Sequence, residues 1–214
     1  MNAIDTIFYL AILLMSVVVN EVSHGFMAEY FGDRTARDAG RLTLNPLNHL
    51  DPFGSVILPI LLFISTGSTG HPIVFGWAKP VPYNPHNLRN EKWGSIAVAA
   101  AGVLSNIFLA LVFGLILRFS ISHFGLIFRA SGFITIVSFI VITNLALAIF
   151  NLIPVPPLDG SKIIFPLFPR TFYPLVEFIE RYSLFLLLIF IFFFSQWLVP
   201  VIMYFYSLLT GLAF

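Results

Sequence analysis

Four polar side chains in otherwise apolar surroundings are the residues of this sequence that could do chemistry. Asn20, Glu21 and His24 lie in VVVNEVSHG, within a long apolar run, and Asp159 follows a proline-rich break in LIPVPPLDGS. Ionisable groups within membrane helices are costly and are usually functional. These four residues are therefore the first candidates for a functional site.

The spacing of positions 20 and 24 is that of two side chains on one face of a helix. In HExxH, two histidines at this spacing bind one zinc ion, and the glutamate between them lies beside the metal-bound water. Here Asn20 occupies the place of the first histidine. An ExxH pattern alone is common in helices, so a metal site also requires a third ligand, for which Asp159 is the best candidate.

The composition is that of an integral membrane protein. Of the 214 residues, 58% are apolar and only 10% are charged, and the mean hydropathy is +0.95. Soluble domains carry about 25% charged residues. The net charge of +1 gives no reason to expect a nucleic-acid partner, and the absence of cysteine excludes disulfides and thiolate metal sites. The first apolar run has no basic n-region or cleavage site, so we expect it to be retained.

Apolar runs long enough to span a bilayer, about 20 residues, occur at 4–31, 93–117, 131–151 and in much of 181–214. The shorter run 53–65 contains Pro59, and its length is typical of a re-entrant segment. The C-terminal block is long for one span and short for two. Pro200 and the SQW before it mark either a kink or a turn.

The placement of lysine and arginine predicts the orientation. With the end of the first span in the cytoplasm and segment 53–65 re-entrant, only Arg118 and Arg129 lie outside. The other nine basic residues lie inside: Arg34, Arg37, Arg41, Lys79, Arg89, Lys92, Lys162, Arg170 and Arg181. His24 and Asp159 then both lie toward the cytoplasmic ends of their helices, at a similar depth.

Five stretches resemble motifs of the site-2 protease family of intramembrane zinc metalloproteases, in the family's order. The stretches are NEVSHG, GRLTLNPLNHLDPFGS, FGWAKPVP with NPHNLRN, AGVLSN and NLALAIFNLIPVPPLDGS, all within residues 13–162. They resemble most the short bacterial members of the family, which have no PDZ or CBS domain. The resemblance implies an all-α polytopic bundle with a re-entrant segment and a short membrane-associated β-hairpin. We expect one membrane domain over 1–214, with a motif-bearing core at 4–162 and a C-terminal transmembrane segment or hairpin at 181–214.

The same resemblance implies a function and the residues that carry it. One Zn²⁺ ion would be bound at position 20, His24 and Asp159, with Glu21 as general base and Asn144 orienting the substrate or the oxyanion. The substrates would be single-span membrane proteins in regulated intramembrane proteolysis, at the bacterial inner membrane with the active site toward the cytoplasm. Asn144 and Asn106 have a simpler alternative role as hydrogen-bonding residues between helices.

The predicted hairpin falls on GRLTLNPLNHLDP. Residues 41–44 alternate polar and apolar side chains, which is the strand period, and Asn45-Pro46 is a turn signal. An exposed edge there could hold an unwound substrate by strand addition. A structural cap over the active site explains the same pattern equally well.

Asn20 departs from the family, because an amide is a poor zinc ligand beside imidazole or carboxylate. We therefore expect weak zinc binding and little or no proteolysis by this sequence. The asparagine is either a deliberate change that inactivates the enzyme or the natural residue of a pseudoprotease that binds transmembrane helices. The retention of Glu21, His24 and Asp159 favours the first explanation. A transporter with an ion relay is a further alternative, but we find none of the internal repeats common in transporters.

Overall fold

The computed structural model describes residues 3–51, 57, 79–124 and 132–212, and among these residues it is a bundle of helices. Four helical stretches are long and apolar enough to cross a membrane: Ile7–Tyr30, Glu91–His123, Gly132–Asn151 and Ser183–Thr210. The first three lie in α1 (Ala3–Tyr30), α4 (Glu91–Phe124) and α6 (Gly132–Asn151). The four predicted spans are confirmed, and the chain is a multi-pass membrane protein.

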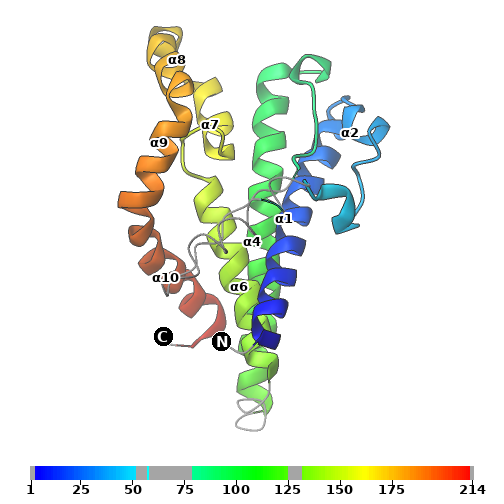
Figure 1. Cartoon of the computed structure of the whole chain (residues 1–214), viewed down its shortest axis with the longest axis vertical. Helices are drawn as coiled ribbons and strands as arrows, with labels where there is room; N and C mark the ends of the chain where they lie inside the picture. The colour runs from blue at the N-terminus through cyan, green and yellow to red at the C-terminus, as the bar shows by residue number, and fades with distance from the viewer. Residues whose placement is uncertain (1–2, 52–56, 58–78, 125–131, 213–214) are drawn as a thin grey trace.

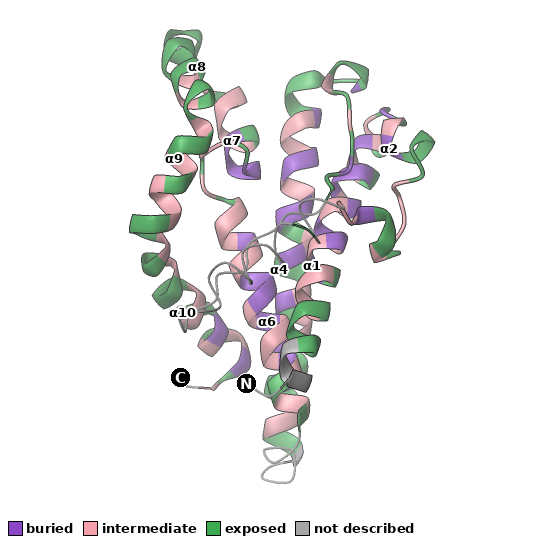
Figure 2. Cartoon of the chain, in the orientation of Figure 1, coloured by how far each residue is buried: buried purple, intermediate pink, exposed green. Residues whose placement is uncertain are grey.

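Helices α1, α4 and α6 pack against one another and form the centre of the bundle. They alternate in direction, so that the end of α1, the start of α4 and the end of α6 lie at the same end of the molecule (Figure 1). Buried residues concentrate where the three helices meet (Figure 2). Within a helix the backbone N–H and C=O groups are hydrogen-bonded to one another. The side chains between these helices therefore determine what the interior can bind.

The C-terminal block is one bent segment. It runs through α9 (Ser183–Ile189), a π-helical stretch (Phe190–Phe194), a 3₁₀ turn (Ser195–Trp197) and α10 (Leu198–Thr210). Pro200 lies in the first turn of α10, where proline is tolerated, so the bend falls before it. Tyr206 of α10 is buried against Val141 and Leu117 of the central helices. No residue of α9 is buried, as expected of a surface facing lipid.

Shorter elements connect the spans at the end where α1 finishes. Before α4 these are α2 (Thr35–Asp38) and two 3₁₀ turns (Pro46–His49 and Pro85–Asn87). After α6 the chain forms α7 (Asp159–Ile164), two 3₁₀ turns (Phe165–Leu167 and Arg170–Phe172) and α8 (Tyr173–Arg181). All but two of the chain's lysines and arginines lie in or beside these connections, which agrees with a polar end outside the bilayer.

The predicted β-hairpin is wrong for the residues that the structure describes, since none of them forms a strand. Local contacts replace a strand partner over residues 41–49. The side chain of Asn45 accepts a hydrogen bond from the Leu47 amide at 3.1 Å and starts the 3₁₀ turn, and the His49 ring contacts the Thr43 carbonyl at 2.8 Å. The alternation of residues 41–44 therefore reflects a folded loop. The predicted re-entrant segment 53–65 lies outside the described residues, apart from Ile57.

Asp33, directly after α1, ties two connecting segments together. Its carboxylate is fully buried and accepts hydrogen bonds from the hydroxyl and amide of Thr35, from the Asn84 amide at 2.6 Å and from Asn87 Nδ2 at 2.9 Å. Burial raises the pKa of Asp33, but these hydrogen bonds to the charged form outweigh burial and lower it. The ionised carboxylate therefore fixes residues 84–87 to the end of α1.

We predict that Asp33→Asn destabilises the fold by about 1–3 kcal/mol at pH 7, because an amide cannot accept all of these hydrogen bonds. A lowered pKa in the folded state gives stability above the unfolded-state value of about 3.9. That stability disappears as the pH falls through the folded-state pKa. The difference in melting temperature between the two proteins in detergent should therefore shrink below about pH 4. Asp38→Asn is the matched control and should change little, because Asp38 is exposed. An equal Asp33→Asn effect at pH 3 and pH 7 would contradict the charge argument.

Candidate functional site

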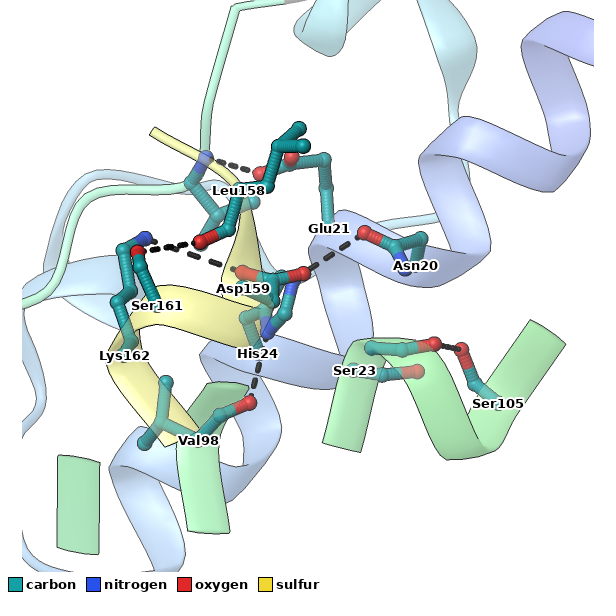
Figure 3. A network of polar contacts seen from close by, with 12 residues as sticks. Asn20, Glu21, Ser23, His24, Val98, Ser105, Leu158, Asp159, Ser161 and Lys162 are labelled. Atoms are coloured by element: carbon teal, nitrogen blue, oxygen red, sulfur yellow. Dashed lines mark hydrogen bonds and ion pairs between the residues drawn. The ribbon is translucent and has the colours of Figure 1, made fainter. Parts of the chain in front are cut away.

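His24 lies at the centre of a polar cluster formed by α1, α4 and α7. Its Nδ1 is 2.7 Å from the Val98 carbonyl oxygen, and its Nε2 is 3.1 Å from Asn20 Oδ1 and 3.2 Å from Asp159 Oδ2. In Figure 3, Asn20 and Asp159 approach the ring from α1 and α7. The predicted meeting of positions 20, 24 and 159 thus occurs in the structure.

The hydrogen bonds of the imidazole decide what can lie at Nε2. A carbonyl oxygen can only accept, so Nδ1 carries a proton that it donates to Val98. Nε2 then faces two oxygen atoms within 3.2 Å. Such an arrangement is favourable when Nε2 is also protonated or when a cation lies between the three atoms. Donation from the other ring nitrogen to a backbone carbonyl is also the usual arrangement around a metal-binding histidine.

The proline-rich break after α6 brings Asp159 to this position. Helix α6 ends at Asn151, and Asp159 is the first residue of α7. A β-carbon at Gly160 would lie 2.5 Å from the carbonyl oxygen of Ile153, so only glycine allows α7 to approach this turn so closely. Lys162 Nζ lies 3.8 Å from Asp159 Oδ1, so the Asp159 carboxylate lies between the His24 ring and the Lys162 ammonium group.

Glu21 lines the same cavity, and among the described residues its carboxylate bonds to a backbone group and not to His24. Its Oε2 accepts a hydrogen bond from the backbone amide of Val81 at 2.8 Å. The cavity has a volume of about 530 Å³ and is lined by Asn20, Glu21, His24, Asp159 and Lys162, together with apolar and aromatic side chains of α1, α4, α6 and residues 80–83. A cavity of this size, mainly apolar with a few polar side chains in its wall, can admit water and a segment of peptide.

Asn144 lies elsewhere and is not among the residues that line the cavity. Its side chain is fully buried, and its Nδ2 donates to Ser16 Oγ at 3.0 Å and to the Ile140 carbonyl at 2.8 Å. Asn106 of α4 is also fully buried. The Ser16 contact joins α1 to α6, so Asn144 contributes to packing between helices, and its predicted role toward substrate stays a prediction.

Three contributions to the site were not identified from the sequence. They are the Val98 carbonyl, the Val81 amide and Gly102, which leaves room for Asn20 and His24. The first two are backbone groups, which carry no signal in residue types. The run of small residues AVAAAG at 97–102 does signal a close approach between helices, and it could have directed attention to Gly102.

The donor atoms of this chain do not make a complete zinc site. His24 Nε2 and Asp159 Oδ2 are ligand types that zinc prefers, whereas Asn20 offers a neutral amide. No group of three His, Cys, Asp or Glu side chains converges anywhere in the ranges that the structure describes. Two strong ligands are fewer than the three protein ligands of known catalytic zinc sites.

The fold and these contacts define a helical membrane protein with a metalloprotease-like polar site between its helices. The profile of Peptidase family M50 matches residues 119–194. A Bacillus subtilis (strain 168) protein named "Putative zinc metalloprotease YwhC" is 38% identical over 164 residues, which cover 75% of this chain and 69% of the relative. The chain belongs to this peptidase family, the site-2 proteases, which confirms the resemblance seen in its motifs.

Two mycobacterial relatives are named "Putative zinc metalloprotease Rip2". The Mycolicibacterium smegmatis protein is 34% identical over 154 residues, and that of Mycobacterium tuberculosis (strain H37Rv) is 31% identical over 153 residues. Each match covers 72% of this chain and 54% of the relative, so the chain spans about half the length of the Rip2 proteins. No solved structure matches the chain.

We predict that Gly102→Ala disrupts the cluster. An added β-carbon would overlap the His24 ring and lie 2.8 Å from Asn20 Nδ2, so we expect a loss of about 1–3 kcal/mol in unfolding free energy despite the higher helix propensity of alanine. Thermal unfolding in detergent measures the loss. Gly132→Ala in α6 is the control, because its β-carbon would meet nothing within 4 Å. Equal melting temperatures for the two variants would show that the site tolerates the added methyl group.

Proposed function

We propose that this chain is an intramembrane endopeptidase of the site-2 type whose zinc site is disabled by Asn20. The observation that carries the proposal is that Asn20 Oδ1 and Asp159 Oδ2 both lie within 3.2 Å of His24 Nε2. Glu21 lines the same cavity. These are the positions that the family's motif assigns to its three zinc ligands and its general base. Histidine at position 20 would complete a set of ligand types that zinc prefers.

The proposed reaction is hydrolysis of a peptide bond, with Glu21 as general acid and base. Glu21 accepts a proton from a water molecule while the water oxygen attacks the scissile carbonyl carbon. The carbon–nitrogen bond then breaks, and the proton passes from Glu21 to the leaving nitrogen, which gives a carboxylic acid and an amine. Proton transfer of this kind contributes typically about 10²–10⁴-fold to a rate.

Asn20 would lower activity by weakening the metal site. Its Oδ1 lies 3.1 Å from His24 Nε2, so the amide already forms a polar contact with the nitrogen that would bind zinc. Turning the amide would place Nδ2 opposite Nε2 as a hydrogen-bond donor, since the two amide atoms are nearly equal in size. In either orientation Asn20 competes with a metal ion for Nε2.

The proposed substrates are single-span proteins of the bacterial inner membrane, cleaved near its cytoplasmic face. The site lies toward the end of the bundle that carries nine of the eleven lysines and arginines, and this supports the cytoplasmic orientation. In an intact helix the carbonyl groups are hydrogen-bonded and shielded by side chains. A substrate must therefore unwind locally before water can attack.

A second candidate function is a pseudoprotease that binds transmembrane helices without cleaving them. The contact between Asn20 Oδ1 and His24 Nε2 supports it, because it gives the ring nitrogen a polar partner without a metal ion. The two candidate functions differ in one measurable property: whether a histidine at position 20 restores zinc binding.

We predict that Asn20→His binds near-stoichiometric zinc and that the unchanged chain binds much less. Zinc is measured by elemental analysis of the purified proteins in detergent, after equilibration with the same free zinc concentration. Asn20→Gln is the matched control, because it enlarges the side chain without supplying an imidazole. The physical reason is that a third ligand of a preferred type completes the first coordination shell.

Three outcomes of this measurement lead to different conclusions. Zinc in Asn20→His alone supports the disabled protease. Equal zinc in all three proteins would mean that other residues build the site. Folded protein without zinc in every variant would favour the pseudoprotease.

A further inference from the structure

Residues 79–83, which we call the strap, cross the cavity beside α1 and bring a backbone amide to Glu21. Val81 is buried, whereas its neighbours Pro80 and Pro82 are exposed, so the side chains alternate as in an extended segment. Pro80, Val81 and Tyr83 line the cavity that contains Asn20, Glu21, His24 and Asp159. The strap is therefore one wall of the candidate active site.

The sequence of the strap leaves a single hydrogen-bond donor at this place. Proline has no backbone N–H group, so among residues 80–82 only Val81 can donate from its main chain. That amide donates to Glu21 Oε2 at 2.8 Å. An amide that donates to a carboxylate makes a stronger hydrogen bond than one that donates to a neutral group. Within the part of the chain that the structure describes, the other carboxylate oxygen of Glu21 has no hydrogen-bond partner and can accept a proton.

Gly25 allows the strap to lie this close to α1. A β-carbon on Gly25 would lie 2.9 Å from Val81 Cγ1 and 2.5 Å from Leu42 Cδ2. A larger residue would push the strap outward, away from Glu21, which is one helical turn earlier on α1. The glycine and the hydrogen bond thus support the same close approach through different contacts.

Contacts on both sides of the strap hold it in place. The Lys79 amide donates to the His49 carbonyl at 2.8 Å. Beyond the strap, the Asn84 amide donates to Asp33 Oδ2 at 2.6 Å, and the Arg89 amide donates to the Phe31 carbonyl at 2.9 Å. These acceptors lie directly after α1 or in the loop that follows. The strap therefore cannot shift along α1 without breaking several hydrogen bonds.

We propose that the peptide N–H of Val81 is a positioning group that fixes the orientation of the Glu21 carboxylate. This proposal rests on the proposed function, in which Glu21 is the general acid and base. Glu21 has three rotatable side-chain bonds, and among the residues that the structure describes it is the Val81 amide that hydrogen-bonds to its carboxylate. A general base must lie within hydrogen-bond reach of the proton that it takes, and the strap restricts Glu21 to one region of the cavity.

The first test measures amide exchange at Val81 in ¹⁵N-labelled protein in detergent micelles and needs no activity. We expect Glu21→Ala to speed the exchange of the Val81 amide roughly tenfold or more, the factor expected when a hydrogen bond to a charged group is lost. Glu21→Gln should exchange at a rate between those of the unchanged chain and Glu21→Ala, because its amide oxygen can still accept but carries no charge. Equal exchange rates in Glu21→Ala and Glu21→Gln would overturn the contact, since burial alone would then explain the protection.

The second test asks whether the contact serves catalysis, in the Asn20→His background. The probe is a synthetic single-span peptide with a Gly-Pro break at mid-span and a fluorophore–quencher pair across it. Val81→Pro removes the N–H, whereas Val81→Ala keeps it and removes more of the side chain. We expect kcat of Val81→Pro to be about tenfold lower than that of Val81→Ala, with the same KM in both variants. The expected loss is smaller than the full rate contribution of a positioned general base, which is about 10²–10⁴-fold.

The results separate the positioning role from the proposed function. Equal kcat values for the two Val81 variants would overturn the positioning role even if the exchange test supports the contact. Absence of hydrolysis in Asn20→His, with zinc bound, would count against the proposed function and with it against a catalytic purpose of the strap. The exchange comparison would still decide whether Val81 holds Glu21.

Discussion

The approach of Asp159 to His24 is the interaction on which the rest of the site depends. It joins α1 to α7, which are separated by most of the sequence, and places a carboxylate 3.2 Å from an imidazole nitrogen inside a membrane bundle. Three features make it possible: the break after α6, the absence of a side chain at Gly160 and the Val98 carbonyl that orients the ring. Loss of any of them would leave a buried polar group without its partner, which is costly in an apolar interior.

The same interaction explains why an asparagine is tolerated at position 20. His24 Nε2 and Asp159 Oδ2 lie 3.2 Å apart, and Lys162 adds positive charge beside Asp159. An amide at position 20 adds a neutral polar contact at 3.1 Å without another buried charge. The fold therefore tolerates Asn20, whereas metal binding depends on the ligand type at this position.

The sequence predicts the spans and the meeting of the site residues, because both follow from patterns along the chain. Apolar length gives the helices, and the proline break before Asp159 gives the helix start that places it beside His24. The prediction of a strand at residues 41–44 is wrong, because the same alternation occurs in a loop closed by Asn45 and His49. The Val81 amide and the Val98 carbonyl could not be predicted, since a backbone group at a distant point of the chain has no signature in residue type.

The strap shows how a membrane protein can position a carboxylate at low cost. A side-chain donor for Glu21 would have to be desolvated in the bundle, and a charged donor would neutralise the base that it orients. A peptide N–H has neither drawback, because it must find an acceptor in any case. The flanking prolines leave Val81 as the single main-chain donor at residues 80–82, and Asp33 fixes the adjoining residues outside the membrane. The position of Glu21 therefore depends on a loop anchored in the polar region as well as on the helix that carries it.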